Sequence, residues 1–283
     1  MKYAATAIAF FLAVCSNAQW TVINLHPAGA RWSEAYGVDG RQQVGWALFG
    51  PDDRHAGLWS GTPGSWVNLN PVGAFESRAD DVGGGQQVGY ADIGGIRRAS
   101  LWSGTASSWV DLSPAGAAGS VAEDVWGGQQ VGAAMFGGFY HAGLWSGTAG
   151  SWVDLNPAGA IRSYAAGVQD GQQVGGAMFG DDFHAGLWSG TAGSWVDLHP
   201  VEARDSRAIA VSGGQQVGAT NMGNGISHAS LWYGSAESWV DSIRGGSGLA
   251  RMPWAWTAAN RWASSGLASH LTPVCGPARP LRG

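Results

Sequence analysis

Histidine recurs at one position in a series of repeated segments, and it is the first residue type here that could do chemistry. Four segments carry it and the second carries arginine instead: His55, Arg98, His141, His184 and His228. A ring of imidazoles could hold a metal ion or an anion, but zinc needs about three or four ligands converging at close range. Equivalent residues of separate repeats lie far apart. We therefore predict no metal site and a structural role, in which a ring nitrogen is bonded to a carbonyl of the neighbouring unit, and we keep the four histidines as ligand-binding candidates.

Carboxylates are the second candidate chemistry, because glycosidases use two of them about 5 to 10 Å apart in a cleft. One carboxylate or amide follows Trp-Val in each unit: Asn68, Asp111, Asp154, Asp197 and Asp241. A catalytic pair occurs once, whereas an Asp or Asn in every unit favours a turn that accepts backbone hydrogen bonds. Other acids break the repeat, in variable loops where solvated charge is the ordinary explanation: Asp52, Asp53, Asp181, Asp182, Glu202 and Asp205.

Motifs of catalysis are absent from the sequence. It contains no Gly-x-Ser-x-Gly elbow, metalloprotease helix or phosphate-binding loop. We therefore predict that the protein is not an enzyme and has no catalytic residues and no cofactor, with an extracellular hydrolase kept as an alternative.

The elements that position these residues come from an internal repeat of 43 or 44 residues. A Gln-Gln pair begins at Gln42, Gln86, Gln129, Gln172 and Gln215, and a tryptophan precedes Val-Asp or Val-Asn at Trp66, Trp109, Trp152, Trp195 and Trp239. Units of this length stack or form a ring, because no single unit can bury its own apolar faces.

Each unit predicts four short strands with turn residues between them. In the fourth unit we expect strands over 152–155, 163–168, 172–177 and 184–189, with Asp170-Gly171 as a turn. Four antiparallel strands in about 40 to 45 residues is typical of a β-propeller blade. The sequence therefore predicts an all-β propeller, with a β-solenoid of two coils per unit as the alternative.

The start of the repeat region supports closure of a ring. Residues 23–30 match residues 67–74, so the repeats begin inside a unit. A propeller that starts in this way donates one strand to a blade that the other end of the chain completes. We expect six or more blades.

Tryptophans also recur, at strand ends: Trp59, Trp102, Trp145, Trp188 and Trp232. They could stack on sugar rings, but apolar residues at fixed repeat positions are typical of a continuous core, in which each buries about 200 Å². We predict packing between blades for the tryptophans and backbone bridging for the Gln-Gln amides. A lectin-like glycan binder, the alternative, requires solvent-facing Trp or Gln.

Composition excludes several partners. The formal net charge is −5, and all 20 acidic residues lie within residues 19–241, which contain no Lys and no Cys. An acidic surface argues against nucleic acid. The absence of cysteine there excludes disulfides and thiolate metal sites, so stability must come from packing.

Gln-Val-Gly, followed about ten residues later by His-Ala-x-Leu-Trp and then Asp-Leu, resembles the HAF-type probable extracellular repeat family. The match covers residues 24–241, with Gly or Ser where that family has Phe: Gly57, Ser100, Gly143, Gly186 and Ser230. The resemblance implies a bacterial, secreted, propeller-like protein and brings no catalytic residues with it. We expect a non-catalytic interaction or structural module, with an extracellular polysaccharide or protein as partner.

The two ends of the chain differ from the repeat region at 19–241. Residues 1–18 have Lys2, an apolar run and Ser16-Asn17-Ala18, which predicts a signal peptide cleaved after Ala18; lipidation at Cys15 is the alternative. We expect a secreted or cell-surface protein with no integral membrane segment. In residues 242–283 the repeat vanishes, and a shifted reading frame over 254–280 can encode the missing motifs. Our hypothesis is an out-of-frame sixth repeat, which resequencing the gene would test; a divergent tail is the alternative.

Overall fold

The structure, a computed structural model, describes residues 21–223 and 225–242. Within these ranges the chain forms five four-stranded antiparallel sheets, numbered here sheet 1 to sheet 5 in chain order. The predicted all-β architecture is confirmed. The expected signal peptide (1–18) and nearly all of the expected out-of-frame segment (242–283) lie outside the described residues.

Each sheet has three longer strands and a last strand of two residues. Sheet 1 contains β1 (Trp32–Asp39), β2 (Gln42–Leu48), β3 (Arg54–Trp59) and β4 (Val67–Asn68). Sheet 2 contains β5 (Ala74–Gly83), β6 (Gln86–Ile93), β7 (Ile96–Trp102) and β8 (Val110–Asp111). Sheet 3 contains β9 (Ser120–Trp126), β10 (Gln129–Phe136), β11 (Phe139–Trp145) and β12 (Val153–Asp154).

The last two sheets follow the same plan. Sheet 4 contains β13 (Arg162–Gln169), β14 (Gln172–Phe179), β15 (Asp182–Trp188) and β16 (Val196–Asp197). Sheet 5 contains β17 (Asp205–Ser212), β18 (Gln215–Asn221), β19 (Ser227–Trp232) and β20 (Val240–Asp241). A 3-10 turn precedes each last strand: Pro63–Ser65, Ala106–Ser108, Ala149–Ser151, Ala192–Ser194 and Ala236–Ser238.

The four strands predicted in the fourth unit are all present, with ends shifted by a few residues. The strand predicted over 152–155 is β12, and it pairs with β11, so it completes sheet 3 rather than opening sheet 4. The predicted turn is also present. Asp170 (φ 50°) and Gly171 (φ 78°) both have the positive φ that a two-residue hairpin turn requires.

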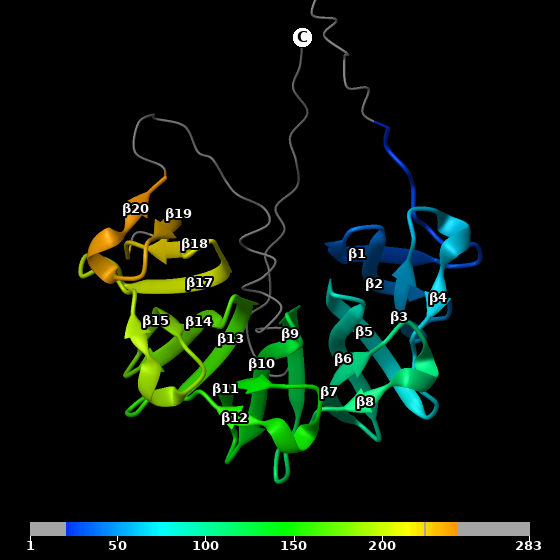
Figure 1. The fold of residues 1–283 in the computed structure, drawn as a ribbon, viewed down its shortest axis with the longest axis horizontal. Helices are drawn as coiled ribbons and strands as arrows, with labels where there is room; N and C mark the ends of the chain where they lie inside the picture. The colour runs from blue at the N-terminus through cyan, green and yellow to red at the C-terminus, as the bar shows by residue number, and fades with distance from the viewer. Residues whose placement is uncertain (1–20, 224, 243–283) are drawn as a thin grey trace, which may run out of the picture.

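The sheets are arranged as an arc, with sheets 1 and 5 at its two ends (Figure 1). The first strand of each sheet lies on the inner side of the arc and the two-residue strand on the outer side (Figure 1). Each first strand contains a β-bulge, which adds one residue and increases the local twist. This is the architecture of β-propeller blades.

The core lies between sheets. The first of its clusters joins sheets 1 and 2 and consists of Val44, Ala56, Leu58, Leu69, Ala79, Val82 and Trp102. The same positions form a cluster at each of the next three junctions. The five strand-ending tryptophans are at most 1% exposed, which confirms their prediction as packing residues.

Hydrogen bonds between sheets accompany this packing. The Ser77 hydroxyl of sheet 2 accepts the backbone N–H of Ala56 in sheet 1 at 2.9 Å. Ser120, Ser163 and Ser206 accept equivalent bonds at the next three junctions. Each bond contributes about 1 kcal/mol net, so a junction combines apolar burial with a buried polar contact that fixes the position of one sheet on the next.

Candidate functional site

The repeated histidines are bonded within their own sheets. Nδ1 of His141 lies 2.8 Å from the Asp154 carboxylate, and Nδ1 of His184 lies 2.8 Å from that of Asp197. His228 forms the same pair with Asp241. The prediction of a bond to a carbonyl of the neighbouring unit was wrong. The fourth strand pairs with the strand that carries the histidine, so its carboxylate reaches the imidazole first.

The remaining histidine and the arginine of this series follow the same geometry. His55 lies 2.9 Å from the Asn68 amide, and Arg98 donates to Asp111 at 2.8 Å. Among the residues that the structure describes, no group of three or more His, Cys, Asp or Glu side chains could hold a metal ion.

The repeated acids close turns, as predicted. The second carboxylate oxygen of Asp154 accepts the backbone N–H of Asn156 at 2.8 Å, and Asp197 does the same for His199. With one oxygen on a histidine and the other on the backbone, each acid connects a strand to the turn that follows it.

The second glutamine of each Gln-Gln pair bridges backbone, also as predicted. In sheet 4, Gln173 is fully buried, donates to the Gly171 carbonyl at 3.0 Å and accepts the Gly190 N–H at 2.7 Å. These buried amides are therefore structural and are not available to bind a polymer.

The acids that break the repeat in loops are not brought together into one site. Asp53 forms an ion pair with His55 at 2.7 Å in sheet 1, whereas Asp205 of sheet 5 accepts the backbone N–H of Phe183 at 3.1 Å. Asp52 is exposed at one end of the arc and Asp181, Asp182 and Glu202 are exposed in sheet 4 and the connection that follows it.

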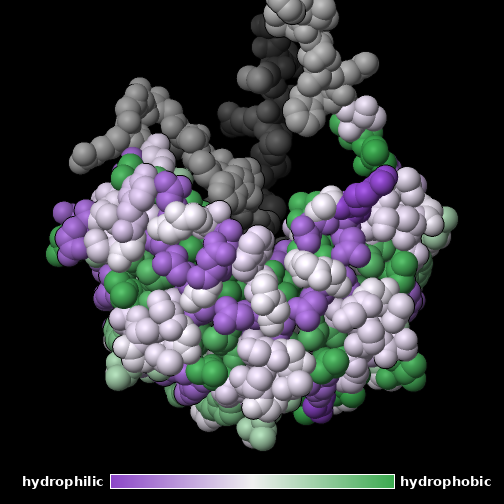
Figure 2. Space-filling model, viewed as in Figure 1, coloured by the Kyte–Doolittle hydropathy of each residue, from purple (hydrophilic) through white to green (hydrophobic). Residues whose placement is uncertain are grey.

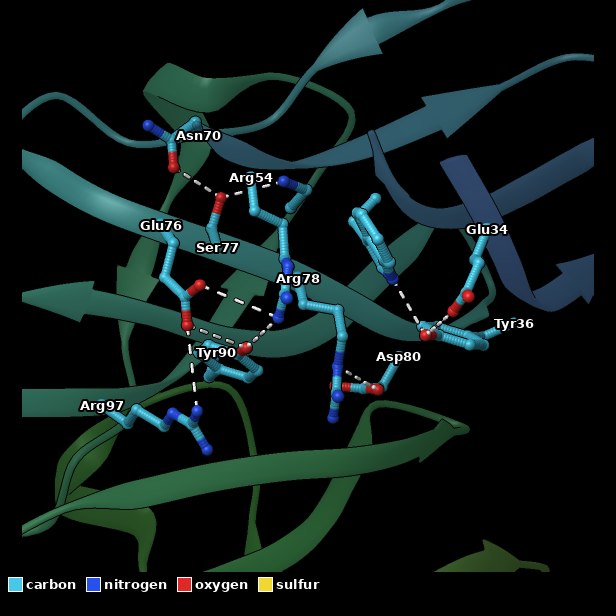
Figure 3. Close-up of polar contacts among 12 residues, drawn as sticks. Glu34, Tyr36, Arg54, Asn70, Glu76, Ser77, Arg78, Asp80, Tyr90 and Arg97 are labelled. Carbon is cyan, nitrogen blue, oxygen red and sulfur yellow. Dashed lines mark hydrogen bonds and ion pairs between the residues drawn. The ribbon is translucent and has the colours of Figure 1, made fainter. Parts of the chain in front are cut away.

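A different group of residues breaks the repeat and does converge. We call it the polar cluster, and it spans β1 to β3 of sheet 1 and β5 to β7 of sheet 2 (Figure 3). Its members are Glu34, Tyr36, Trp46, Arg54, Glu76, Arg78, Asp80, Tyr90 and Arg97.

One half of the polar cluster is centred on Glu76. Arg54 and Arg97 approach the two oxygens of Glu76 at 3.7 and 3.8 Å, and the Tyr90 hydroxyl donates to it at 3.2 Å. Arg54 and Arg97 come from different sheets, and their side chains are about one-third exposed. A carboxylate is thus held between two guanidinium groups that still contact solvent (Figure 3).

The other half is more deeply buried. Arg78 Nε lies 2.8 Å from Asp80, whose side chain is 0% exposed, and the Arg78 guanidinium stands over the rings of Tyr36 and Tyr90 at 5.7 and 5.0 Å. The Tyr36 hydroxyl donates to Glu34 and accepts the Trp46 indole N–H. Arginines over aromatic faces and a bonded carboxylate make a pre-organised array.

Burial and neighbouring charge shift the titration of these groups. Burial raises the pKa of Tyr36, and its bond to Glu34 raises it further. Burial also raises the pKa of Tyr90. Burial lowers the pKa of Arg78, but the charges of Asp80 and Glu123 outweigh it and leave that pKa raised. Both phenols are therefore neutral hydrogen-bond donors at physiological pH, and Arg78 is charged.

Sheets 3 and 4 show that the fold does not need these charges, whereas sheet 5 again has an arginine, Arg207, at the position of Arg78. The antiparallel partners Arg78 and Tyr90 of sheet 2 correspond to Val121 and Ala133 in sheet 3, and to Tyr164 and Gly176 in sheet 4. Burying an ion pair costs several kcal/mol of desolvation for each ion, and apolar residues of similar volume often serve stability better. The polar cluster therefore costs stability that sheets 3 and 4 avoid.

Sequence reasoning missed the polar cluster because it searched the loops for residues that break the repeat. The available signal was a departure at strand positions, where Arg78 and Tyr90 replace the small or apolar residues of sheet 3. Exposed Trp32, 58% accessible, adds an aromatic ring beside the cluster, since its indole N–H donates to Glu34 at 3.2 Å.

The chain aligns with solved structures. The chain aligns with a crystal structure of TolB from Acinetobacter baumannii at 13% identity and a TM-score of 0.49, over 74% of this chain and 54% of that one. It aligns with puromycin hydrolase at 15% identity and a TM-score of 0.54, and with a variant of that enzyme complexed with PGG at 15% and 0.55. Both alignments cover 75% of this chain and 37% of the other.

The likeness to puromycin hydrolase shows the fold alone. The fold is a β-propeller. The chain spans about a third to a half of the length of these solved structures. Neither the scan against family models nor the search of curated proteins finds a match to the chain. Among the described residues of this propeller, no helix has the length and apolar character needed to cross a membrane.

Proposed function

We propose that this propeller is a non-catalytic binding module and that its ligand contacts the polar cluster between sheets 1 and 2. The observation that carries the proposal is the convergence of three arginines, three carboxylates and three aromatic residues at one junction. In a repeat protein, residues that maintain the fold recur in every unit, so a costly ion-pair network that sheets 3 and 4 lack favours a role outside the fold.

The geometry of the cluster favours binding over catalysis. Arg54 and Arg97 hold Glu76, while Asp80 is bonded to Arg78, so these carboxylates are engaged by guanidinium groups. General acid-base catalysis needs a proton-transfer group within reach of substrate, whereas this network fixes side chains in place for recognition. An extracellular hydrolase would be favoured only if turnover of a substrate depended on Glu76.

A glycan is the ligand class that we favour within this proposal, because of Trp32. Its ring is largely exposed and its N–H donates to Glu34. The equivalent residue of sheet 4, Arg162, is exposed although sheet 3 packs against that sheet, so a neighbouring sheet leaves this position open. Trp32 thus offers a flat apolar face next to charged hydrogen-bonding groups. Arg54 and Arg97 can donate several hydrogen bonds each to hydroxyl or carboxylate oxygens. A sugar ring presents both an apolar face and hydroxyl groups, and so matches both features.

Binding can be tested with a panel of soluble neutral and acidic polysaccharides, measured by isothermal titration calorimetry on the full chain. We expect at least one to bind, and Arg97→Ala or Trp32→Ala to weaken that binding about tenfold or more, the effect of losing about 1.4 kcal/mol. The matched control is Arg162→Ala, an exposed arginine of sheet 4 over the Phe183 ring. Binding that all three variants retain, or that Arg162→Ala alone abolishes, would contradict the assignment.

We further propose that the protein is exported and belongs with the HAF-type repeats that its sequence resembles. Residues 1–18 support export by their composition, and the repeated Gln-Val-Gly and His-Ala-x-Leu-Trp motifs support the relationship. Fusion of residues 1–24 to a phosphatase that is active only outside the bacterial cytoplasm should give activity, and Ala7→Arg with Phe11→Arg should abolish it by interrupting the apolar run.

A further inference from the structure

The two ends of the arc carry surfaces that are buried at every inner junction. Val38 of sheet 1 is 69% exposed, whereas its equivalents Val82 and Val125 are 3% and 2% exposed. At the other end, Val217 of sheet 5 is 41% exposed, whereas its equivalent Val174 is fully buried. Sheet 1 thus presents the face that receives a preceding sheet, and sheet 5 presents the face that receives a following one.

Within the described residues, sheet 1 also lacks the hydrogen bond by which each of the other sheets is joined to the sheet before it. Ser33 occupies the position of Ser77 and Ser206, whose hydroxyls accept a backbone N–H from the preceding sheet. Among residues 21–223 and 225–242, no backbone N–H donates to Ser33. Its hydroxyl is nevertheless held in the junction geometry, because His26 Nδ1 lies 2.8 Å from it, as His199 Nδ1 lies 2.8 Å from Ser206.

The segment before sheet 1 has the sequence of a fourth strand without the rest of its sheet. Residues 23–30 repeat the pattern of 67–74, in which Val67–Asn68 forms β4 and Leu69 is fully buried. Residues 22–24 form no strand, Ile23 is 56% exposed and Leu25 is partly exposed. Residues 23–24 therefore lie where they could be the fourth strand of a further sheet.

We infer that one further unit of the same repeat closes the arc, packing between sheets 5 and 1 and taking Ile23–Asn24 as its fourth strand. A sheet from a second copy of the chain would fit this position poorly, since each of its sheets already has a fourth strand of its own.

Insertion of a sixth unit tests the inference directly. The full chain would receive a copy of residues 155–191 between Asp241 and Ser242, which supplies three strands and leaves the fourth to Ile23–Asn24. We expect the midpoint of thermal unfolding to rise by about 5 °C or more, since each kcal/mol shifts it by about 2–4 °C in a domain of this size. No rise would overturn the inference.

A matched pair of substitutions distinguishes closure from a nonspecific effect of the insert. Ile23→Asp with Leu25→Asp should remove most of the rise in the inserted chain and change the unmodified chain by no more than about 2 °C, because both residues are at least partly exposed there. A rise that survives these substitutions would show that Ile23–Asn24 is not the fourth strand, and would overturn the inference.

Measuring self-association tests whether a second copy of the chain covers the exposed faces instead. Light scattering on the unmodified chain should give the mass of a monomer at micromolar concentration. A dimer that Val38→Asp and Val217→Asp each convert to a monomer would show that a second copy covers these faces, and would overturn closure by a sixth unit.

Discussion

Sheets 2 and 3 have the same topology and the same inter-sheet core, but they differ in the side chains at strand positions outside that core. Ala79 and Val82 of sheet 2 are buried against sheet 1 as Ala122 and Val125 of sheet 3 are buried against sheet 2. The differences are Arg78 and Tyr90 against Val121 and Ala133, Arg98 against His141, and Ser100 against Gly143. A blade therefore tolerates wide variation as long as its junction core is unchanged.

The comparison separates the part of the repeat that stabilises the propeller from the part that is free to acquire a function. Hydrophilic residues gather along the inner part of the arc, whereas hydrophobic residues are dispersed over all five sheets (Figure 2). The polar cluster belongs to the variable part. Its charges are costly where they are buried, and sheet 3 shows the less costly solution.

The largest effect is expected from breaking the buried ion pair of sheet 2. Arg78→Ala should lower the free energy of unfolding by about 3 to 5 kcal/mol, because it leaves the fully buried Asp80 carboxylate without its guanidinium. Val121→Ala at the equivalent position of sheet 3 should cost about 1 to 2 kcal/mol, from lost apolar burial. Urea denaturation of both variants measures the difference, and equal losses would contradict our account of the cluster.

The second prediction concerns Gly143, which packs against the ring of Trp152, the tryptophan just before β12. A Cβ on Gly143 would lie 1.7 Å from the Trp152 ring, so Gly143→Ala should destabilise by about 1 to 3 kcal/mol as that ring is displaced. In sheet 2, Trp109 instead donates its indole N–H to Ser100 at 2.8 Å.

Two controls sharpen this second comparison. Ser100→Gly should cost about 1 kcal/mol for the lost hydrogen bond, and Gly150→Ala, in open space, should be nearly neutral. Near-ultraviolet circular dichroism of the tryptophans should change for Gly143→Ala. An unchanged spectrum together with unchanged stability would refute the packing argument.

The third prediction uses the contact between sheets 2 and 3. Burial raises the pKa of Asp81 from 3.8 to about 8, and the neighbouring Asp124 carboxylate raises it as well. The folded state therefore keeps a proton that the unfolded state loses above about pH 4. Consequently, the free energy of unfolding should fall as pH rises from about 4 to about 8, by on the order of 1 kcal/mol or more.

Substitution of the acid provides the check. Asp81→Asn should flatten this part of the pH profile, whereas Asp92→Asn, near the end of β6, where the carboxylate accepts the Gly95 N–H, should leave it in place. A profile with the same slope in wild type and Asp81→Asn would assign the pH dependence to other groups.

The smallest effect is expected at the repeated position that carries histidine in four units and arginine in the second. His141→Ala in sheet 3 and Arg98→Ala in sheet 2 should each cost less than about 1 kcal/mol, because their contacts with Asp154 and Asp111 are solvent-accessible. Thermal unfolding at pH 7 measures both. A loss of 2 kcal/mol or more in the free energy of unfolding of either variant would contradict this. It would mean that the contact helps to hold two sheets together and does not only close a turn at the surface.

Sequence periodicity was sufficient to predict the blades, the turn at Asp170-Gly171 and the structural roles of the strand-ending tryptophans and of Gln173. These features depend on local chain geometry repeated at constant spacing. The partner of His141 was predicted incorrectly because β12 joins the sheet before it, and strand pairing decides which carboxylate an imidazole reaches.

The sequence by itself determined the unit: its length, its strands, its turns and the residues that must be apolar, because these follow from alternation and from glycine at positions of positive φ. Only the tertiary structure decided which units meet. It brought Arg54 to Glu76 across a sheet boundary and Arg78 over Tyr36, and it left Val38 and Val217 exposed at the two ends of the arc. The physical reason is that these contacts join residues of different sheets, and their geometry depends on how one sheet twists and packs against the next.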